Sequence, residues 1–263
     1  GCCGTTPAHI EALADEVALL PPRTVPSGAK PHTVSGIDGL IYEETMRPLF
    51  VGERTNVIGS RKFKRLIAEN KFEEASEIAR AQVKNGAHVI DICLADPDRD
   101  EAEDMEGFLT EAMKKVKAPF VIDSTDKTVI EKALKYSQGK AIINSINLED
   151  GEERFADILP LVKQFGGALV VGTIDEEGMA VTAAKKLAVA VRSHQLLTEK
   201  YGIPASDIIF DPLVFPVGTG DEQYIGSAKE TIEGIRLIKE QLPECLTILG
   251  VSNVSFGLPP VGR

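Results

Sequence analysis

Short apolar runs that alternate with helical segments constrain this chain more than any other feature of its sequence. From Pro48 onward, seven β-branched runs end in polar residues, and segments with apolar residues at helical spacing lie between them. Runs this short, bounded by Gly or Pro, are typical of fully buried parallel strands. Seven β/α units in a row favour a barrel over a sandwich or a helical bundle. The expected strands are Pro48–Gly52, His88–Cys93, Phe120–Asp123, Ala141–Asn144, Ala168–Ile174, Ile208–Asp211 and Leu246–Gly250.

The predicted fold class is therefore α/β, a (β/α)8 TIM barrel that is truncated before its eighth strand. The sequence stops at Arg263, shortly after the seventh run. A barrel short of one strand has two open edges, which natural proteins avoid. We therefore expect these 263 residues to be part of a longer polypeptide.

The first 47 residues lack this alternation and form a separate region of the sequence. A turn of small residues precedes a segment near Ala8–Leu19, and a stretch containing Pro, Gly and Ser follows without any period, as in a linker. The apolar residues of the first segment are spaced for one buried helical face: Ile10, Leu13, Val17 and Leu20. We expect residues 1–20 to end a preceding module, residues 21–47 to be a linker, and residues 48–263 to form the barrel, incomplete at its C-terminus.

Composition and charge exclude several classes of partner. The net charge is -11, and the longest basic cluster is Arg61–Arg65, whereas nucleic-acid binding needs a sustained basic face. No apolar run approaches the roughly 20 residues that cross a bilayer. Four cysteines in a chain of this size do not suggest a disulfide framework. We expect a cytoplasmic protein with no nucleic-acid or membrane partner.

The expected strands end in an unusual concentration of carboxylates and side-chain amides. In (β/α)8 barrels the binding site lies at the carboxyl ends of the strands. A single carboxylate there often caps the following helix. Polar groups at the end of every strand must also satisfy one another or a ligand, since burial without a partner costs each about 1–3 kcal/mol. These residues are Glu53, Asn56, Asp91, Asp123, Asn144, Asp175, Asp211 and Asn253.

The residue types at these strand ends indicate recognition of a planar polar ligand. The four histidines have no metal-ligand spacing, and no G-x-S-x-G or H-E-x-x-H motif occurs. A carboxylate can accept hydrogen bonds from a ring N–H and the amine beside it, and an Asn offers both a donor and an acceptor. A heterocycle with N–H, NH2 and C=O groups along one edge, such as a pterin, suits this set.

Five ordered motifs between about Phe50 and Arg263 resemble the pterin-binding methyltransferase family. The similarity is greatest to the folate-binding modules of cobalamin-dependent methionine synthases, with corrinoid iron–sulfur protein methyltransferases and dihydropteroate synthases as more distant relatives. The motifs are Gly52-Glu53-Arg54-Thr55-Asn56, Ile122-Asp123-Ser124-Thr125, Ile143-Asn144-Ser145, Phe210-Asp211-Pro212-Leu213 and Leu249-Gly250-Val251-Ser252-Asn253-Val254-Ser255.

The segment Gly1-Cys2-Cys3-Gly4-Thr5-Thr6-Pro7 independently resembles the end of the homocysteine-binding module of the same enzymes. There, adjacent cysteines supply two of three zinc thiolates. The resemblance therefore implies that Cys2 and Cys3 are zinc ligands, provided that an upstream third cysteine completes the site.

The resemblance implies transfer of the N5 methyl group of 5-methyltetrahydrofolate to cob(I)alamin on another module, for remethylation of homocysteine to methionine. The partners implied are the cobalamin-binding and homocysteine-binding modules of the same polypeptide. By the same resemblance, Asp123 and Asn144 hold the pyrimidine edge, Asp211 supports a ring N–H, and Asn253 lies nearest N5 as the catalytic residue. The implied folate ligands are Glu53, Asn56, Asp123, Asn144, Asp211, Asn253 and Arg263.

The sequence departs from the family pattern at one position and leaves two alternative functions open. The family often has Asn two residues after the Asp of the second strand, where this chain has Cys93, a weaker hydrogen-bond partner that favours a buried core role. The first alternative is another pterin-binding barrel, such as a corrinoid protein methyltransferase or a dihydropteroate synthase. A dihydropteroate synthase would share the pterin site but would condense p-aminobenzoate with a pterin pyrophosphate. A non-catalytic folate- or corrinoid-binding scaffold would also fit, because the expected catalysis relies on positioning.

Overall fold

The computed structural model describes residues 2–24, 28, 31–259 and 261, and the chain divides into two compact units, Gly1–Lys30 and Pro31–Arg263. The first unit contains one helix, α1 (Pro7–Ala18), which confirms the helix expected near Ala8–Leu19. Its apolar side, formed by Ile10, Leu13 and Val17, is 50–61% exposed. The described residues of the first unit therefore leave this helical face largely exposed.

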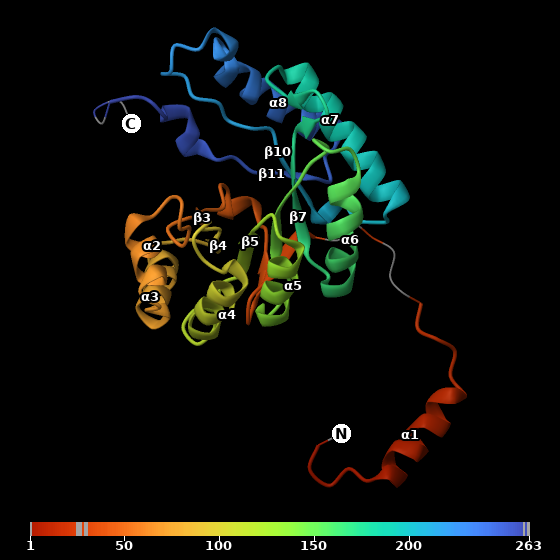
Figure 1. The fold of residues 1–263 in the computed structure, drawn as a ribbon. Helices are drawn as coiled ribbons and strands as arrows, with labels where there is room; N and C mark the ends of the chain where they lie inside the picture. The colour runs from red at the N-terminus through yellow and green to blue at the C-terminus, as the bar shows by residue number, and fades with distance from the viewer. Residues whose placement is uncertain (1, 25–27, 29–30, 260, 262–263) are drawn as a thin grey trace. The chain divides into compact units, whose positions relative to one another are not determined.

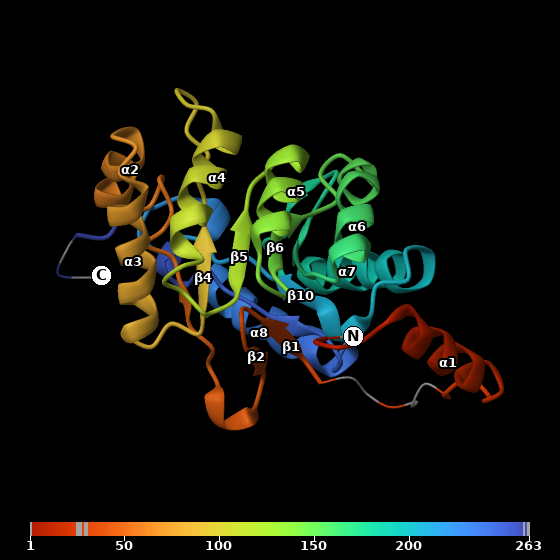
Figure 2. The same ribbon diagram turned by 90° about the horizontal axis from the view of Figure 1, so that it is seen from below.

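The second unit is built on a seven-stranded parallel sheet whose strands follow one another in sequence order. The sheet curls, and its helices cover the outer side (Figures 1 and 2). All seven expected strands are confirmed, and two of them have the expected bounds. The strands are β3 (Val51–Gly52), β4 (Val89–Ile92), β5 (Phe120–Asp123), β6 (Ile142–Ile146), β7 (Ala168–Gly172), β10 (Ile208–Asp211) and β11 (Leu246–Thr247).

Helices or short helical turns follow the strands. Asp100, Asp126 and Thr182 cap the helices after β4, β5 and β7 by accepting hydrogen bonds from first-turn N–H groups, as N-cap residues do. None of the helices in the described residues is long and apolar enough to cross a membrane. The α-helices are α2 (Arg61–Ala68), α3 (Phe72–Lys84), α4 (Glu101–Ala112), α5 (Lys127–Tyr136), α6 (Glu153–Phe165), α7 (Ala183–Gln195) and α8 (Ser227–Gln241).

The remaining elements are short. A hairpin of β8 and β9 follows β7, and a π-helical segment, η2, continues α7. A second hairpin, β1 and β2, precedes the sheet, and 3-10 turns occupy several loops. Their bounds are β1 (Thr33–Ser35), β2 (Gly39–Ile41), β8 (Ile174–Asp175), β9 (Gly178–Met179), η1 (Glu44–Met46), η2 (Leu196–Lys200), η3 (Ala205–Asp207), η4 (Glu222–Tyr224) and η5 (Val251–Ser255).

Successive side chains of each strand alternate between two apolar clusters, one on each face of the sheet. In β5, Phe120 and Ile122 belong to the large core between sheet and helices, whereas Val121 belongs to a smaller inner cluster. Successive side chains of a strand point to opposite faces, which produces this division. The inner cluster lies on the concave side of the sheet and comprises Val34, Val89, Val121, Ile142, Ala168, Val170 and Ile209.

The hairpin of β1 and β2 packs against the barrel. Val34 is 2% exposed and joins the inner cluster. The backbone N–H of Ser35 donates to the carbonyl of Lys140 at 3.0 Å, and the N–H of Lys140 donates to Ser35 Oγ at 2.7 Å. The structure thus assigns residues 31–47 to the compact barrel unit, where the sequence suggested a linker over 21–47, because alternating polar and apolar residues in such a short hairpin give too weak a period to detect.

Candidate functional site

Four polar side chains form a layer at the carboxyl ends of the central strands. Each lies two residues after a member of the inner apolar cluster, so it points to the same concave side of the sheet. Asp123 and Asn144 are register partners on β5 and β6. The pairs of inner residue and polar residue are Val89 with Asp91, Val121 with Asp123, Ile142 with Asn144, and Ile209 with Asp211.

Asp91 lies at the centre of a hydrogen-bonded group. Its side chain is 4% exposed and makes hydrogen bonds with the side chains of Asn56 and Asn144. Asn56 Oδ1 accepts from the backbone N–H groups of Ile58 and Gly59 at 2.8 and 3.1 Å, which directs the Asn56 amide nitrogen to Asp91. Asn56 therefore acts as a support for Asp91 and for its own loop.

Burial and neighbouring carboxylates raise the pKa of Asp91 and of Asp123. Burial, together with the charges of Asp123 and Glu53, raises the pKa of Asp91 to about 8. Burial and the charge of Glu101 raise the pKa of Asp123 to about 6, although a hydrogen bond with Cys93 opposes this change. At neutral pH Asp91 is thus mainly protonated and Asp123 mainly ionised. Within the layer, the charged acceptor Asp123 thus lies beside protonated Asp91 and the neutral amide of Asn144.

Asp211 closes the layer on the β10 side. Its Oδ1 accepts a hydrogen bond from the N–H of Leu213 at 2.9 Å, so the turn after β10 fixes the direction of the carboxylate. Burial raises the pKa of Asp211, and the hydrogen bond from Leu213 and the charge of Lys186 oppose this change.

A cavity of about 520 Å³ lies between the loop after β3 and the short helix η5 after β11. It contains Asn253, the expected catalytic residue, together with Glu53, another expected ligand. The structure therefore brings Asn253 and Glu53 together although they are 200 residues apart in sequence. Arg263 lies outside the described residues. The cavity is lined by Glu53, Arg54, Gly59, Ser252, Asn253, Ser255 and Phe256.

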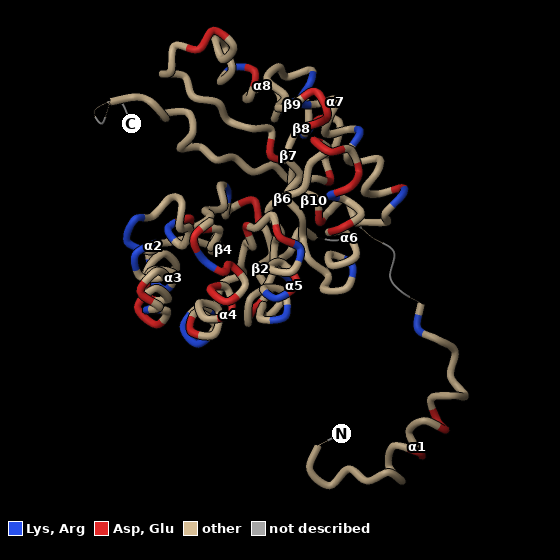
Figure 3. Tube along the Cα trace, in the orientation of Figure 1, with Lys and Arg blue, Asp and Glu red and all other residues tan. Residues whose placement is uncertain are grey.

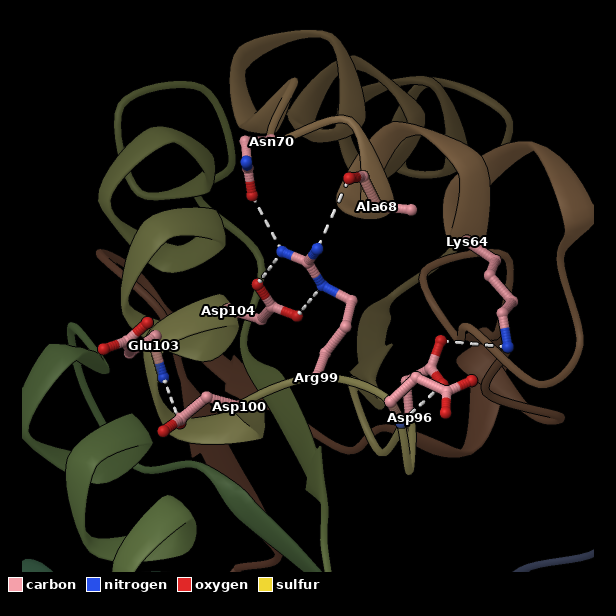
Figure 4. A network of polar contacts seen from close by, with 9 residues as sticks. Lys64, Ala68, Asn70, Asp96, Arg99, Asp100, Glu103 and Asp104 are labelled. Atoms are coloured by element: carbon pink, nitrogen blue, oxygen red, sulfur yellow. Dashed lines mark hydrogen bonds and ion pairs between the residues drawn. The ribbon is translucent and has the colours of Figure 1, made fainter.

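The loop after β4 is held by a polar network around Arg99 (Figure 4). Arg99 donates to both carboxylate oxygens of Asp104 at 2.6 Å, to Asn70 Oδ1 at 2.7 Å and to the carbonyl of Ala68 at 3.3 Å. A bidentate guanidinium–carboxylate pair is rigid. The network connects the β4–α4 loop to the end of α2. It thereby holds in place the loop that follows Asp91.

A second cation supports the loop after β5. Arg154 of α6 donates to the carbonyls of Ser124 and Thr125 at 3.0 and 2.6 Å, directly after Asp123. Elsewhere, Lys and Arg residues are mostly located on the outer helices (Figure 3). Arg99 and Arg154 thus support the loops after β4 and β5, whereas Asp91, Asp123 and Asp211 face the concave side.

Sequence reasoning missed two contributions to this site. The sequence places Asp91 at a strand end and assigns it no role, although its offset from Val89 equals that of Asp123 from Val121. Glu101 acts on Asp123 from the first turn of α4, a position where acidic residues ordinarily complement the helix dipole and so give no separate signal. Cys93 is 3% exposed, as expected of a core cysteine, and also contacts Asp123.

The expected zinc ligands belong to the first unit. Cys2 and Cys3 are exposed, with their sulfur atoms 3.6 Å apart, and hydrogen bonds with Cys3 lower the pKa of Cys2. Two thiolates at this separation suit adjacent ligands of one zinc ion. Within the described part of the chain, no group of three or more His, Cys, Asp or Glu side chains is arranged to hold a metal.

The chain is similar along its whole length to two curated methionine synthases. It is 39% identical over 268 residues to that of Mycobacterium tuberculosis (strain ATCC 25618 / H37Rv) and 37% identical over 271 residues to that of Mycobacterium leprae (strain TN). Each alignment covers 100% of this chain and 22% of the relative. The chain thus spans about a fifth of the length of these proteins.

Solved dihydropteroate synthases share the fold. The enzyme from Thermus thermophilus aligns with a TM-score of 0.56 and 20% identity over 86% of this chain and 79% of that one. The enzyme from Xanthomonas albilineans, in complex with indole-2-carboxylic acid and 6-chloroguanine, aligns with a TM-score of 0.54 and 16% identity over 85% and 78%. These similarities confirm the predicted α/β barrel class. The sequence pattern of the pterin binding enzymes matches residues 52–263, and the chain therefore belongs to this family.

Proposed function

We propose that this chain is the folate-binding methyltransferase module of a cobalamin-dependent methionine synthase. It binds 5-methyltetrahydrofolate and donates the N5 methyl group to cob(I)alamin, which another module of the same polypeptide holds. The single observation that carries this proposal is the similarity to methionine synthases over both the first unit and the barrel. A dihydropteroate synthase would have no use for the Cys2–Cys3 segment. We also propose a cytoplasmic location for this enzyme.

The polar layer supports binding of the pterin edge. Asp123, ionised at neutral pH, accepts hydrogen bonds from a ring N–H and the adjacent exocyclic amine. Asn144 beside it supplies one donor and one acceptor, and Asp91 orients its amide. Asp211 accepts from a second ring N–H. Protonated Asp91 lets the layer hold several acids without mutual repulsion.

The reaction requires a better leaving group at N5. The bond between N5 and the methyl carbon breaks, and its electron pair remains on nitrogen, so N5 must first gain a proton from solvent. Reduced cobalamin, when bound by its own module, supplies the nucleophile that accepts the methyl cation equivalent. Asn253, in the cavity beside Glu53, stabilises the N5–H group by turning its amide to accept that hydrogen bond. The barrel otherwise aligns the methyl group for in-line displacement.

Cys2 and Cys3 provide two thiolates of a zinc site that activates homocysteine in the intact enzyme. Their separation of 3.6 Å and their exposure support this role, which needs a third ligand from the preceding module. The zinc site acts on the methyl acceptor and takes no part in folate demethylation.

Methyl transfer from 5-methyltetrahydrofolate to chemically reduced free cobalamin tests the proposal. We expect the purified chain to accelerate formation of tetrahydrofolate and of the methylated corrinoid. Folate binding without any transfer would instead support a non-catalytic scaffold. A parallel assay with a pterin pyrophosphate and p-aminobenzoate should give no dihydropteroate, and formation of that product would overturn the methyltransferase assignment.

A further inference from the structure

Lys186 is a buried lysine for which the reaction above has no use. Its side chain is 0% exposed, although it starts on α7, a helix that otherwise lies on the outside of the barrel. Burying an ammonium group is costly unless its hydrogen bonds are satisfied. Lys186 Nζ donates to the carbonyl of Ala180 at 2.8 Å and to the carbonyls of Pro212 and Leu213.

These carbonyls belong to the two loops that flank the β10 end of the candidate site. Pro212 and Leu213 follow Asp211 directly, and the N–H of Leu213 donates to Asp211 Oδ1 at 2.9 Å. Leu213 has a φ of 62°, a left-handed conformation that a side chain other than Gly rarely adopts. The turn that aims Asp211 therefore depends on contacts from outside itself, and Lys186 provides them.

Helix α8 is shaped around the lysine. A Cβ atom at Gly234 would lie 2.8 Å from Lys186 Cδ, so the helix needs glycine where the lysine stem passes. Thr231 of the same helix donates from its hydroxyl to the carbonyl of Leu213 at 2.9 Å. The ring of Phe215 lies 4.8 Å from Lys186 Nζ and covers the ammonium group. Gly234 thus leaves room for the aliphatic part of Lys186, and Phe215 covers its ammonium group.

We propose that Lys186 is a positioning residue of the pterin site, which holds the Asp211–Leu213 turn from beneath and thereby directs the Asp211 carboxylate toward the ligand. This inference deepens the proposed function and rests on Asp211 being a folate ligand. It assigns the lysine no contact with substrate.

The charge of Lys186 has a second consequence for Asp211. The charged groups that act on Lys186 are Asp211 from β10 and Glu230 from α8, and both oppose the lowering of its pKa to about 8 by burial. In turn Lys186 opposes the rise in the pKa of Asp211 that burial causes. Removing the ammonium charge should therefore raise the pKa of Asp211 further and weaken its ionised, acceptor form at neutral pH.

Two substitutions of Lys186 and one of Thr231 separate the charge from the hydrogen bonds. Lys186→Met keeps the stem against Gly234 and removes both, whereas Lys186→Gln keeps a donor and removes the charge. Thr231→Val is the matched control, since it removes one hydrogen bond to Leu213 and no charge. Lys186→Gln also keeps the test available if the Met variant does not fold.

The pKa of Asp211 is measured by isotope-edited NMR titration of its carboxyl group. The signal is assigned by its absence in Asp211→Asn. We expect a higher pKa for Asp211 in both Lys186 variants and an unchanged one in Thr231→Val. Calorimetry with 5-methyltetrahydrofolate measures the effect on folate affinity. We expect affinity to be lower by about 10- to 100-fold in Lys186→Met and by about 2- to 5-fold in Thr231→Val.

A double-mutant cycle with Asp211→Asn decides whether Lys186 acts through Asp211. We expect Lys186→Met to lower affinity by less than about two-fold in the Asp211→Asn background. Additive losses, or an unchanged Asp211 pKa in both Lys186 variants, would overturn the inference. If Lys186 and Asp211 are coupled as expected but no methyl transfer occurs, the proposed reaction is wrong and the role of Lys186 in folate binding still holds.

Discussion

Asp123 and Asn144 stand side by side as register partners on the parallel strands β5 and β6, each directly above a residue of the inner apolar cluster. An ionised carboxylate offers two acceptor oxygens, and the amide beside it offers one acceptor and one donor group. The edge of a pterin presents the complementary groups in one plane. We propose that this pair recognises the pterin edge in the barrel.

Asp123→Asn should mainly damage folate binding. The substitution keeps the shape but places N–H donors against the N–H donors of the pterin, and it removes charge-assisted hydrogen bonds. We expect a loss of about 2–4 kcal/mol in binding free energy. Calorimetry measures it, and Asp157→Asn on the outer side of α6 is the matched control. An affinity within about three-fold of the wild type would remove Asp123 from the pterin site.

Asn253→Ala should lower methyl transfer more than folate affinity. In the proposed reaction its hydrogen bond to N5 strengthens as N5 becomes protonated. Loss of an interaction made mainly in the transition state lowers kcat rather than raises KM. We expect kcat to fall by about 100-fold, the effect typical of one lost transition-state hydrogen bond. Ser255→Ala, which lines the same cavity, should have a much smaller effect. An unchanged kcat with weaker folate binding would show that Asn253 only holds the ground state.

Asp91 should make the stability of the unliganded chain depend on pH. Its folded pKa of about 8 lies above the unfolded value near 3.9, so the folded state binds the extra proton between these values. The stabilisation is complete below the unfolded pKa and is lost as pH rises through about 8. Asp91→Asn removes this dependence.

Urea unfolding at pH 6 and pH 9 tests the Asp91 prediction. Between these values the wild type should lose about 1–3 kcal/mol more stability than Asp91→Asn. Parallel losses in both proteins would mean that Asp91 is ionised in the folded state at pH 6. Asp98→Asn, an exposed carboxyl in the loop after β4, serves as the control.

Gly36→Ala should destabilise the barrel by preventing the β1–β2 hairpin from packing. A Cβ atom at Gly36 would overlap the carbonyl oxygen of Lys117, which is backbone and cannot turn aside. We expect a loss of about 2–3 kcal/mol, within the range for overpacked positions. Gly39→Ala in the same hairpin is the matched control, since a Cβ there meets nothing within 4 Å. Chemical unfolding of the two variants gives the comparison, and equal stabilities would contradict the predicted contact.

Zinc should be held weakly by residues 1–263 alone. Catalytic zinc ordinarily has three protein ligands, and Cys2 and Cys3 supply two. Nδ1 of the nearby His9 is occupied at the start of α1, 3.1 Å from the N–H of Thr6. A modest chelator should remove added zinc, as metal analysis would show. One tightly bound zinc per chain would contradict this. Linking an upstream segment with a third thiolate should restore binding, which Cys2→Ser or Cys3→Ser should abolish.

The sequence by itself determined the barrel and most of its polar layer. Strands β5 and β10 were predicted with their observed bounds, because a buried parallel strand needs a continuous apolar run that ends where side chains become polar. The same local rule located Asp123, Asn144 and Asp211. This rule succeeds because the apolar run of a strand and the polar residues that end it are adjacent in sequence.

Only the tertiary structure decided which residues act on one another. The protonation of Asp91 depends on Asp123, Glu53 and Asn144, which come from three other strand ends. The support of Asp211 by Lys186 crosses from α7 to the loop after β10, and the space for that lysine is made by Gly234 of α8. Burial and electrostatic coupling depend on distances between elements far apart in sequence, and no local pattern encodes those distances.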